Sequence, residues 1–175
     1  EGDTIFFLAH RLTTALAQQQ ILCSELRWPS VAEHNLAGLQ FVDIRARGKH
    51  LLMRLGHSSR AELTLHSHLR MDGNWYVAPP KAAQRFRPQH WLRAILETSN
   101  HSVYGTRLGQ LHLIASSDEE NLLGYLGPDL LGGDLDHAAL QARIRNHKAQ
   151  AIATVYLDQR VMAGLGTNLL TEACF

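Results

Sequence analysis

The stretch QFVDIRARGKHLLMRLGHSSRAELTLHSHLRMDGNWYVA, residues 40–78, decides the fold class of this chain. Apolar and polar residues alternate along it with the period of two that is typical of half-buried strands. Gly48 and Gly73 interrupt the alternation, and glycine accepts the positive φ that tight turns require. The pattern predicts antiparallel strands joined by short turns, over residues 40–47, 51–55, 62–68 and 75–78.

The segments on either side of this stretch complete an N-terminal half. Apolar residues with helical spacing lie near the start of the chain, at Ile5, Leu8, Ala9, Leu12 and Leu16. They predict a first helix that Asp3 or Thr4 can cap. Further strands are predicted at residues 91–98 and 108–115, and a basic, flexible loop is predicted at residues 79–88.

After residue 117 the strand pattern stops and helical spacing returns. Helices are predicted over residues 121–126, 135–146 and 149–157, and again from about residue 167. Asp136 is a suitable cap for the second of these helices. The turn Gly164-Leu165-Gly166 is expected to direct backbone amides outward at the start of the last helix, which favours the binding of a phosphate.

The composition agrees with a globular α+β protein of two parts. The hydrophobic fraction is 45%, and no apolar run approaches the roughly 18 residues that a membrane span needs. Cys23 and Cys174 form no CxxC pair, so we expect neither a disulfide framework nor a zinc site within this chain, and a reducing cytosol. We predict an antiparallel β-sandwich domain at residues 1–116 and a helical domain at residues 117–175.

Basic residues are concentrated in one part of the sequence. Residues 45–93 contain ten Lys and Arg but only Glu62 and Asp72 as acids, a balance of +8 in a chain whose net charge is +1. A basic segment within a neutral chain is the electrostatic footprint of a polyanion site. Charged residues that merely solvate exposed strand faces would give the same count, so the charge alone leaves both interpretations open.

Five motifs in order along the chain resemble one family. They are EGDTIF (residues 1–6), RGKHLL (47–52), LTLHSHLRMDGNW (63–75), LGPDLL (126–131) and LDQRVMAGLGTNLLTEACF (157–175). Together they resemble the formamidopyrimidine-DNA glycosylase/endonuclease VIII family, and the RGK and MDGNW details favour its endonuclease VIII branch. The resemblance implies an N-terminal β-sandwich followed by a helix–two-turn–helix domain. It also implies a C-terminal zinc finger beyond Phe175, since we expect the natural chain to extend past both ends of this sequence.

The resemblance implies a base-excision DNA glycosylase with AP lyase activity. Such an enzyme releases oxidised bases, here expected to be pyrimidines, through a Schiff base and then nicks the strand by β,δ-elimination. The nucleophile implied is the amine of a proline immediately before Glu1. Glu1 would donate and accept protons at the sugar, and Lys49 would hold a phosphate and assist proton transfer. Without the motifs, an acid that favours the helix macrodipole and a solvated turn lysine would explain these two residues.

The resemblance also implies a set of DNA-binding residues. Met71 would fill the gap left by an unstacked base, because it is apolar and adaptable. Arg70 would bond the orphaned base or a phosphate, and His68 would donate to a phosphate. The family has Asn where Thr167 stands here, so either Thr167 or Asn168 is expected to make that backbone contact. The remaining members of the predicted set are Gly166 and Lys148.

The expected partner is damaged double-stranded DNA, bound by a monomer in the bacterial cytoplasm at the nucleoid. No diffusible cofactor is expected, and the only metal implied is structural zinc outside this chain. Two alternatives stay open at this point. One is a non-catalytic paralogue that recognises damaged or bent DNA. The other is a small metal-dependent β-barrel enzyme that uses His66 and His68.

Overall fold

The computed structural model describes residues 1–133 and 135–175 and contains two four-stranded antiparallel sheets. Their strand orders are β1-β6-β7-β5 and β2-β3-β4-β8, and every strand pair is antiparallel. The strands are β1 (Cys23–Leu26), β2 (Gln40–Arg47), β3 (His50–His57), β4 (Arg60–His68), β5 (Asn74–Ala78), β6 (Leu92–Glu97), β7 (Ser102–Thr106) and β8 (Gln110–Ala115). The predicted antiparallel β-sandwich is therefore confirmed.

The N-terminal helix α1 (Gly2–Leu16) packs on the sandwich through the face predicted from its spacing. Ile5, Leu8, Leu12 and Leu16 are buried, and they share one core with residues of both sheets. The predicted cap was wrong, because Glu1 is the N-cap and pairs with Thr4 in a capping box. The Glu1 amine donates to Oγ1 of Thr4 at 3.5 Å.

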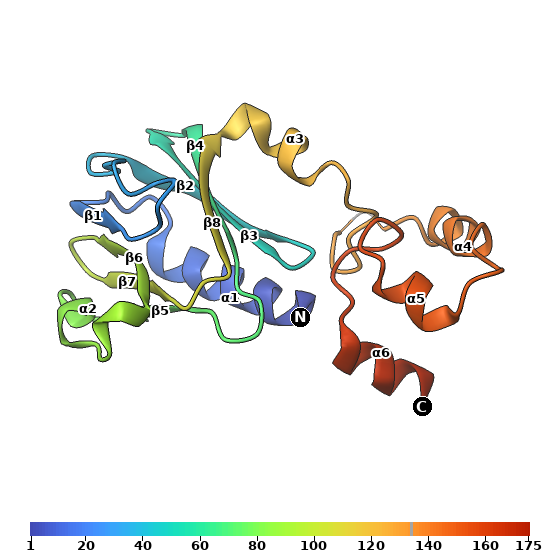
Figure 1. Ribbon diagram of the computed structural model, residues 1–175. Coiled ribbons are helices and arrows are strands. Elements are labelled where there is room, and N and C mark those ends of the chain that lie inside the picture. The colour runs from blue at the N-terminus through green and yellow to red at the C-terminus, as the bar shows by residue number, and fades with distance from the viewer. Residues whose placement is uncertain (134) are drawn as a thin grey trace.

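Helices dominate the chain after β8, as predicted (Figure 1). Asp136 caps α4 as predicted, since its Oδ1 accepts a hydrogen bond from the Ala139 amide at 3.0 Å. In Figure 1 the sandwich and the helices α4–α6 lie on opposite sides, and the N-terminus lies between them. The helices of this part are α3 (Glu119–Leu123), α4 (His137–Arg145), α5 (Ile152–Leu157) and α6 (Thr167–Cys174).

The prediction of a flexible loop at residues 79–88 was wrong. The segment contains the short helix α2 (Ala82–Arg85), and the Ala83 side chain is fully buried against Leu92. The Gln89 amide donates to the carbonyls of Ala83 and Phe86 at 3.0 and 2.9 Å. Sequence reasoning missed this helix because a single buried alanine among basic residues gives no periodic signal.

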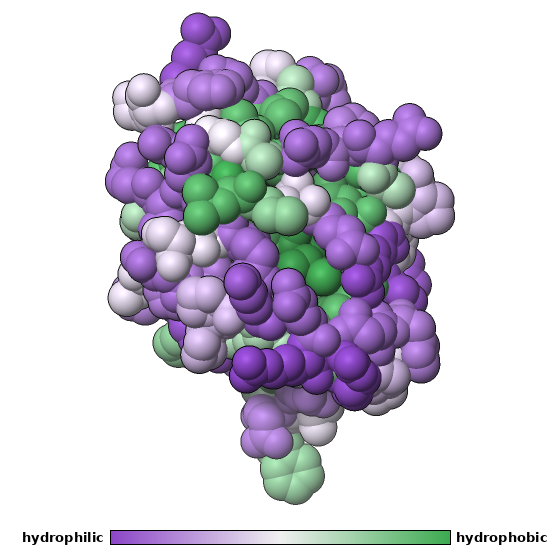
Figure 2. All heavy atoms as spheres, turned by 90° about the vertical axis from the view of Figure 1, so that its left-hand side faces the viewer, coloured by the Kyte–Doolittle hydropathy of each residue, from purple (hydrophilic) through white to green (hydrophobic). Residues whose placement is uncertain are grey.

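The outer surface of the sandwich is largely polar. Figure 2 views the molecule from the side of the sandwich away from α4–α6, and hydrophobic residues form only separate patches there. No helix within residues 1–133 and 135–175 combines the length and the apolar character that crossing a bilayer requires.

A row of imidazoles crosses the sheet β3-β4-β8. His66 is opposite His112 in the strand register, and its Nε2 lies 2.8 Å from Nδ1 of His50. The His66 and His50 side chains are only 1% and 8% exposed. Burial, followed by the charges of neighbouring histidines, lowers the pKa of His50 to about 4 and that of His66 to about 3. Both rings are therefore neutral at pH 7.

The buried imidazoles predict a protein that loses stability in weak acid. Between pH 6.5 and the lowered pKa values the unfolded chain binds more protons than the folded chain, so stability falls as the pH decreases. Each imidazole should contribute a loss of about 2 kcal/mol between pH 7 and pH 5. Urea unfolding at both pH values measures this loss. His66→Gln should reduce it and the exposed control His57→Gln should not; equal losses in all three proteins would contradict the account.

Candidate active site

The carboxylate of Glu1 is held by the start of helix α6. Its two oxygens accept hydrogen bonds from the backbone amides of Asn168 and Leu169, at 2.7 and 3.1 Å. The first amides of a helix lack intrahelical acceptors and carry the positive end of its dipole. The sequence predicted that these amides would be open to a phosphate. Instead, the carboxylate of Glu1 occupies two of them.

Glycines allow this close approach between the two ends of the chain. A Cβ at Gly166 would lie 2.6 Å from the Cδ of Glu1, and a Cβ at Gly2 would lie 2.7 Å from the Cα of Gly164. The Gly2 amide donates to the Gly164 carbonyl at 2.9 Å. Side chains at either position would separate α1 from the segment before α6.

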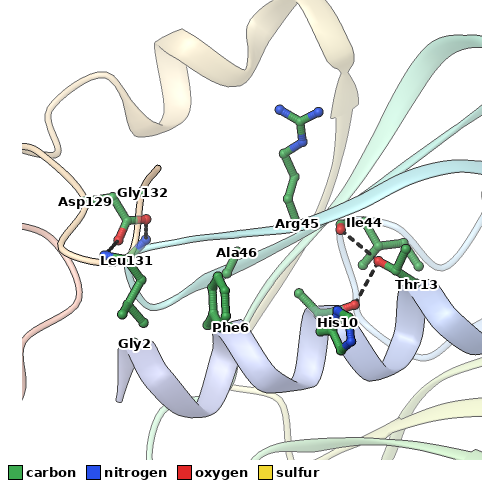
Figure 3. A pocket seen from close by; sticks show the side chains of 12 residues that line it. Gly2, Phe6, His10, Thr13, Ile44, Arg45, Ala46, Asp129, Leu131 and Gly132 are labelled. Carbon is green, nitrogen blue, oxygen red and sulfur yellow. Dashed lines mark hydrogen bonds between the residues drawn. The ribbon is translucent and has the colours of Figure 1, made fainter. Parts of the chain in front are cut away.

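The β2–β3 turn is fixed to the same junction. Gly48 has a φ of 57°, and its amide donates to Oδ2 of Asp129 at 2.7 Å. Oδ1 of Asp129 accepts from the Leu131 amide at 3.0 Å, so one carboxylate joins the turn to the segment after α3 (Figure 3). The cavity shown in Figure 3, of about 230 Å³ between α1 and β2, contains none of the predicted site residues.

Lys49 follows Gly48 in this turn and lies near Glu1. Burial lowers the pKa of the Lys49 ammonium, and the negative charge of Glu1 partly opposes that effect. Lys49 and Glu1 line one cleft of about 430 Å³. Eight of the nine predicted site residues line this cleft, namely Glu1, Lys49, His68, Arg70, Met71, Gly166, Thr167 and Asn168.

The loop after β4 projects one apolar side chain into solvent. Met71 is 94% exposed, so nearly all of its apolar side chain is in contact with solvent beside the cleft. Arg70 precedes it with a φ of 54°, a conformation that non-glycine residues adopt at an energetic cost. The stem of Arg70 lies over Gly109, where an added Cβ would be 2.4 Å from its Cγ. The packing therefore holds Arg70 in position beside an unrestrained Met71.

His68 is held in one tautomer by this loop. Its Nδ1 accepts a hydrogen bond from the Arg70 amide at 3.0 Å, so the neutral ring carries its proton on Nε2. Burial lowers the pKa of His68, and the positive charges of Arg70 and Lys49 lower it further. At pH 7 the ring is therefore a neutral donor through Nε2.

One of the nine predicted site residues lies elsewhere. Lys148 is exposed in the turn after α4 and does not line the cleft. His66 packs against His50 and His112 in the sheet rather than facing a ligand. Within the part of the chain that the structure describes, no three His, Cys, Asp or Glu side chains are grouped to hold a metal. The metal-enzyme alternative thus has no ligand set there.

Sequence reasoning missed several residues that shape the site. Asp129 and Gly109 position the turn and the loop, while Thr4 and Gly73 line the cleft. Asp129 lies within the LGPDLL motif, which was the only signal that could have identified it. Thr4 and Gly73 likewise lie within quoted motifs, EGDTIF and LTLHSHLRMDGNW, whereas Gly109 gains its role from contact with Arg70 in a distant segment.

The cleft combines a carboxylate, a partly desolvated ammonium, a neutral imidazole donor and an exposed apolar side chain. The first two can exchange protons with a bound substrate, since desolvation brings a lysine closer to neutrality. Arg70, Lys49 and the Nε2–H of His68 can bind an anionic backbone. Met71 can enter a base stack.

Comparison with known proteins agrees with this geometry. Residues 3–108 match the formamidopyrimidine-DNA glycosylase N-terminal domain family. The chain is 40% identical over 175 residues to the Streptomyces coelicolor protein named "Probable endonuclease 8 2", of which it covers 62%. It is 35% identical over 175 residues to the Mycolicibacterium smegmatis protein named "DNA-(apurinic or apyrimidinic site) lyase Nei2", of which it covers 66%. The chain thus spans less than two thirds of either relative.

The fold is also similar to a solved structure. Lactococcus lactis formamidopyrimidine-DNA glycosylase, non-covalently bound to DNA that contains an AP site, superposes with a TM-score of 0.78 at 23% identity. The similarity covers 98% of this chain and 65% of that chain. The family match covers more than half of the sequence, and the predicted motif residues meet in one cleft. The chain therefore belongs to the formamidopyrimidine-DNA glycosylase family, as the N-terminal domain match at residues 3–108 shows.

Proposed function

We propose that this protein is a base-excision DNA glycosylase with AP lyase activity that acts on oxidised bases, chiefly pyrimidines. The observation that carries the proposal is the meeting of Glu1, Lys49 and the Met71 loop in one cleft, although they are far apart in the sequence. The named relatives support the class of activity, since one is called an AP lyase and the other a probable endonuclease 8.

The proposed chemistry begins with the amine of a proline that precedes Glu1 in the natural chain. This amine attacks the sugar carbon that bears the damaged base, and the base leaves with its bonding electron pair and a proton. The bond from that carbon to the ring oxygen then breaks, the ring oxygen takes a proton, and the opened sugar is held as an iminium. The iminium allows elimination of the phosphates on both sides of the sugar. Glu1 is adjacent to that amine, and its carboxylate is fixed by Asn168 and Leu169, so it would transfer protons at the sugar.

The rest of the cleft would bind and distort the DNA. Lys49 and the Nε2–H of His68 would donate to the phosphate beside the lesion. Arg70 would form a hydrogen bond with the base that loses its partner when the damaged base is extruded. Met71 would replace the extruded base in the stack. Its side chain is exposed, so entering the DNA would break almost no packing within the protein. Gly166, Thr167, Asn168 and the more distant Lys148 would contact the backbone.

The same proposal covers the organisation of the protein. Residues 1–116 would form the catalytic β-sandwich domain, and residues 117–175 the helix–two-turn–helix domain. The substrate would be damaged double-stranded DNA, bound by a monomer in the bacterial cytoplasm at the nucleoid. The chemistry would need no diffusible cofactor. Structural zinc would bind outside residues 1–175, as the family resemblance implies.

Borohydride trapping of the natural full-length protein tests this function. Duplex DNA with an oxidised pyrimidine should give a covalent adduct, because borohydride reduces the iminium to a stable amine. Peptide mapping should place the adduct on the N-terminal proline. DNA binding without any adduct would instead support a non-catalytic paralogue that recognises damaged DNA.

Replacement of Gly166 should displace the Glu1 carboxylate without changing residue 1 itself. In Gly166→Ala the new Cβ would lie 2.6 Å from the Glu1 carboxyl carbon, so the carboxylate must move. We expect base release to slow by about 100-fold, the usual contribution of a general acid or base. Single-turnover kinetics measures this loss. Gly133→Ala is the matched control, because nothing lies within 4 Å of a Cβ at Gly133. Equal rates for both variants would refute the role of the Glu1 contact.

Truncation of Met71 should impair base extrusion rather than chemistry. We expect Met71→Ala to slow excision from duplex DNA by about tenfold or more, since an unfilled stack disfavours extrusion by a few kcal/mol. Cleavage of a preformed AP site in single-stranded DNA should change little, because no base is extruded there. Leu22→Ala, another exposed apolar residue, serves as the control. An equal loss on both substrates would argue against a wedge.

A further inference from the structure

A second cavity of about 200 Å³ adjoins the cleft. Lys49, His68 and Arg70 line both spaces. The sandwich and the segments after α3 and α5 all contribute to the second cavity, whose other lining residues are His50, Gln110, Tyr125 and Gln159. We call this cavity the donor pocket, because its side chains are mainly hydrogen-bond donors.

The two cations of the donor pocket are not neutralised by ion pairs. The ion pairs found in residues 1–133 and 135–175 use other basic side chains, namely Arg27, Arg45, Arg54, His57 and Arg160. Lys49 and Arg70 thus belong to none of these ion pairs, and the Glu1 carboxylate that acts on Lys49 lies in the adjoining cleft. His68 adds an Nε2–H, since its Nδ1 is occupied by the Arg70 amide.

Neutral donors complete the lining of the pocket. The Tyr125 hydroxyl lies 3.4 Å from Nε2 of His50, a long contact that leaves the hydroxyl able to turn toward a ligand. Gln110 begins β8 directly opposite His68 in the register. Gln159 forms only a wall, because its amide donates to the carbonyls of Leu157 and Leu165 at 3.0 and 2.9 Å.

The lining of the donor pocket includes no carboxylate among the residues described. His50 is neutral, since burial lowers its pKa to about 4, so it adds no repulsive charge beside Lys49. The pocket thus offers two basic side chains and three neutral donors, from His68, Tyr125 and Gln110. A phosphodiester has only one negative charge and two free oxygens, so it cannot pair with all of these groups. A phosphate monoester carries nearly two negative charges and three acceptor oxygens.

We propose that the donor pocket binds the terminal phosphate monoester that strand cleavage leaves on the DNA, so that the protein retains its nicked product. The inference rests on the proposed function, since elimination is the reaction that creates such an end. It goes beyond that function in assigning Tyr125 and Gln110 to product binding rather than to catalysis. Lys49 and His68 would hold the same phosphate before and after its bond to the sugar breaks, and Arg70 would join them once the terminal phosphate is formed.

Small anions test the pocket without DNA. Inorganic phosphate should bind the full chain more tightly than dimethyl phosphate does at constant ionic strength. The binding of each anion can be measured from changes in the NMR signals of the imidazoles and tyrosines. Tyr125→Phe should weaken phosphate binding by about tenfold, the usual effect of one hydrogen bond to a charged group. Tyr76→Phe, on the other sheet, is the matched control. Equal affinities for both anions, or equal effects of both variants, would overturn the proposal.

Gapped duplexes then test the product. A one-nucleotide gap with a 3′-phosphate or a 5′-phosphate should bind more tightly than the same gap with hydroxyl ends, and the stronger of the two identifies the end that is held. Tyr125→Phe should remove this preference while leaving single-turnover base release unchanged. If the protein releases bases but shows no preference for phosphate ends, the proposed role of the donor pocket is refuted and the proposed function is not. Phosphate binding at Tyr125 without base release would refute the proposed function alone.

Discussion

The site depends on one contact, the carboxylate of Glu1 on the first amides of α6. It joins the first residue of the chain to the last helix, and it satisfies two donors that no intrahelical acceptor can reach. Glu1 also begins α1 as its N-cap. The carboxylate that we propose for proton transfer is thereby fixed by the backbone of two helices, so its position depends on the docking of the helical part against the sandwich.

Small residues make that docking possible. Gly2, Gly48, Gly164 and Gly166 come from three separate segments, and a Cβ at Gly2, Gly48 or Gly166 would lie within about 3 Å of a neighbouring segment. Asp129 also joins the β2–β3 turn to the segment after α3, because its carboxylate accepts hydrogen bonds from the amides of Gly48 and Leu131. Lys49 reaches the cleft because its turn is held both by the close packing of Gly48 against Ala163 and by the hydrogen bond from Gly48 to Asp129. The side chains of the cleft are thus placed largely by close glycine contacts and by the hydrogen bonds of Asp129.

Much of the fold and site could be predicted from local patterns. The alternation in residues 40–78 predicts β2 to β5, and the motifs identify eight residues that line one cleft. Strands β1 and β7 were missed because they are short and carry no clear alternation. Gly109, Tyr125 and the bond from Glu1 to α6 were missed for another reason. Each gains its role from a partner far away in sequence, which periodicity cannot reveal.

Amide hydrogen exchange at Asn168 and Leu169 tests the central contact most directly. These amides belong to the first turn of α6, where only the Glu1 carboxylate accepts from them. Slow exchange depends on a persistent hydrogen bond. The account predicts protection of both amides in the unaltered protein and its loss in Glu1→Ala, with the amides of α4 unchanged. Rapid exchange in the unaltered protein, or protection that survives Glu1→Ala, would contradict it.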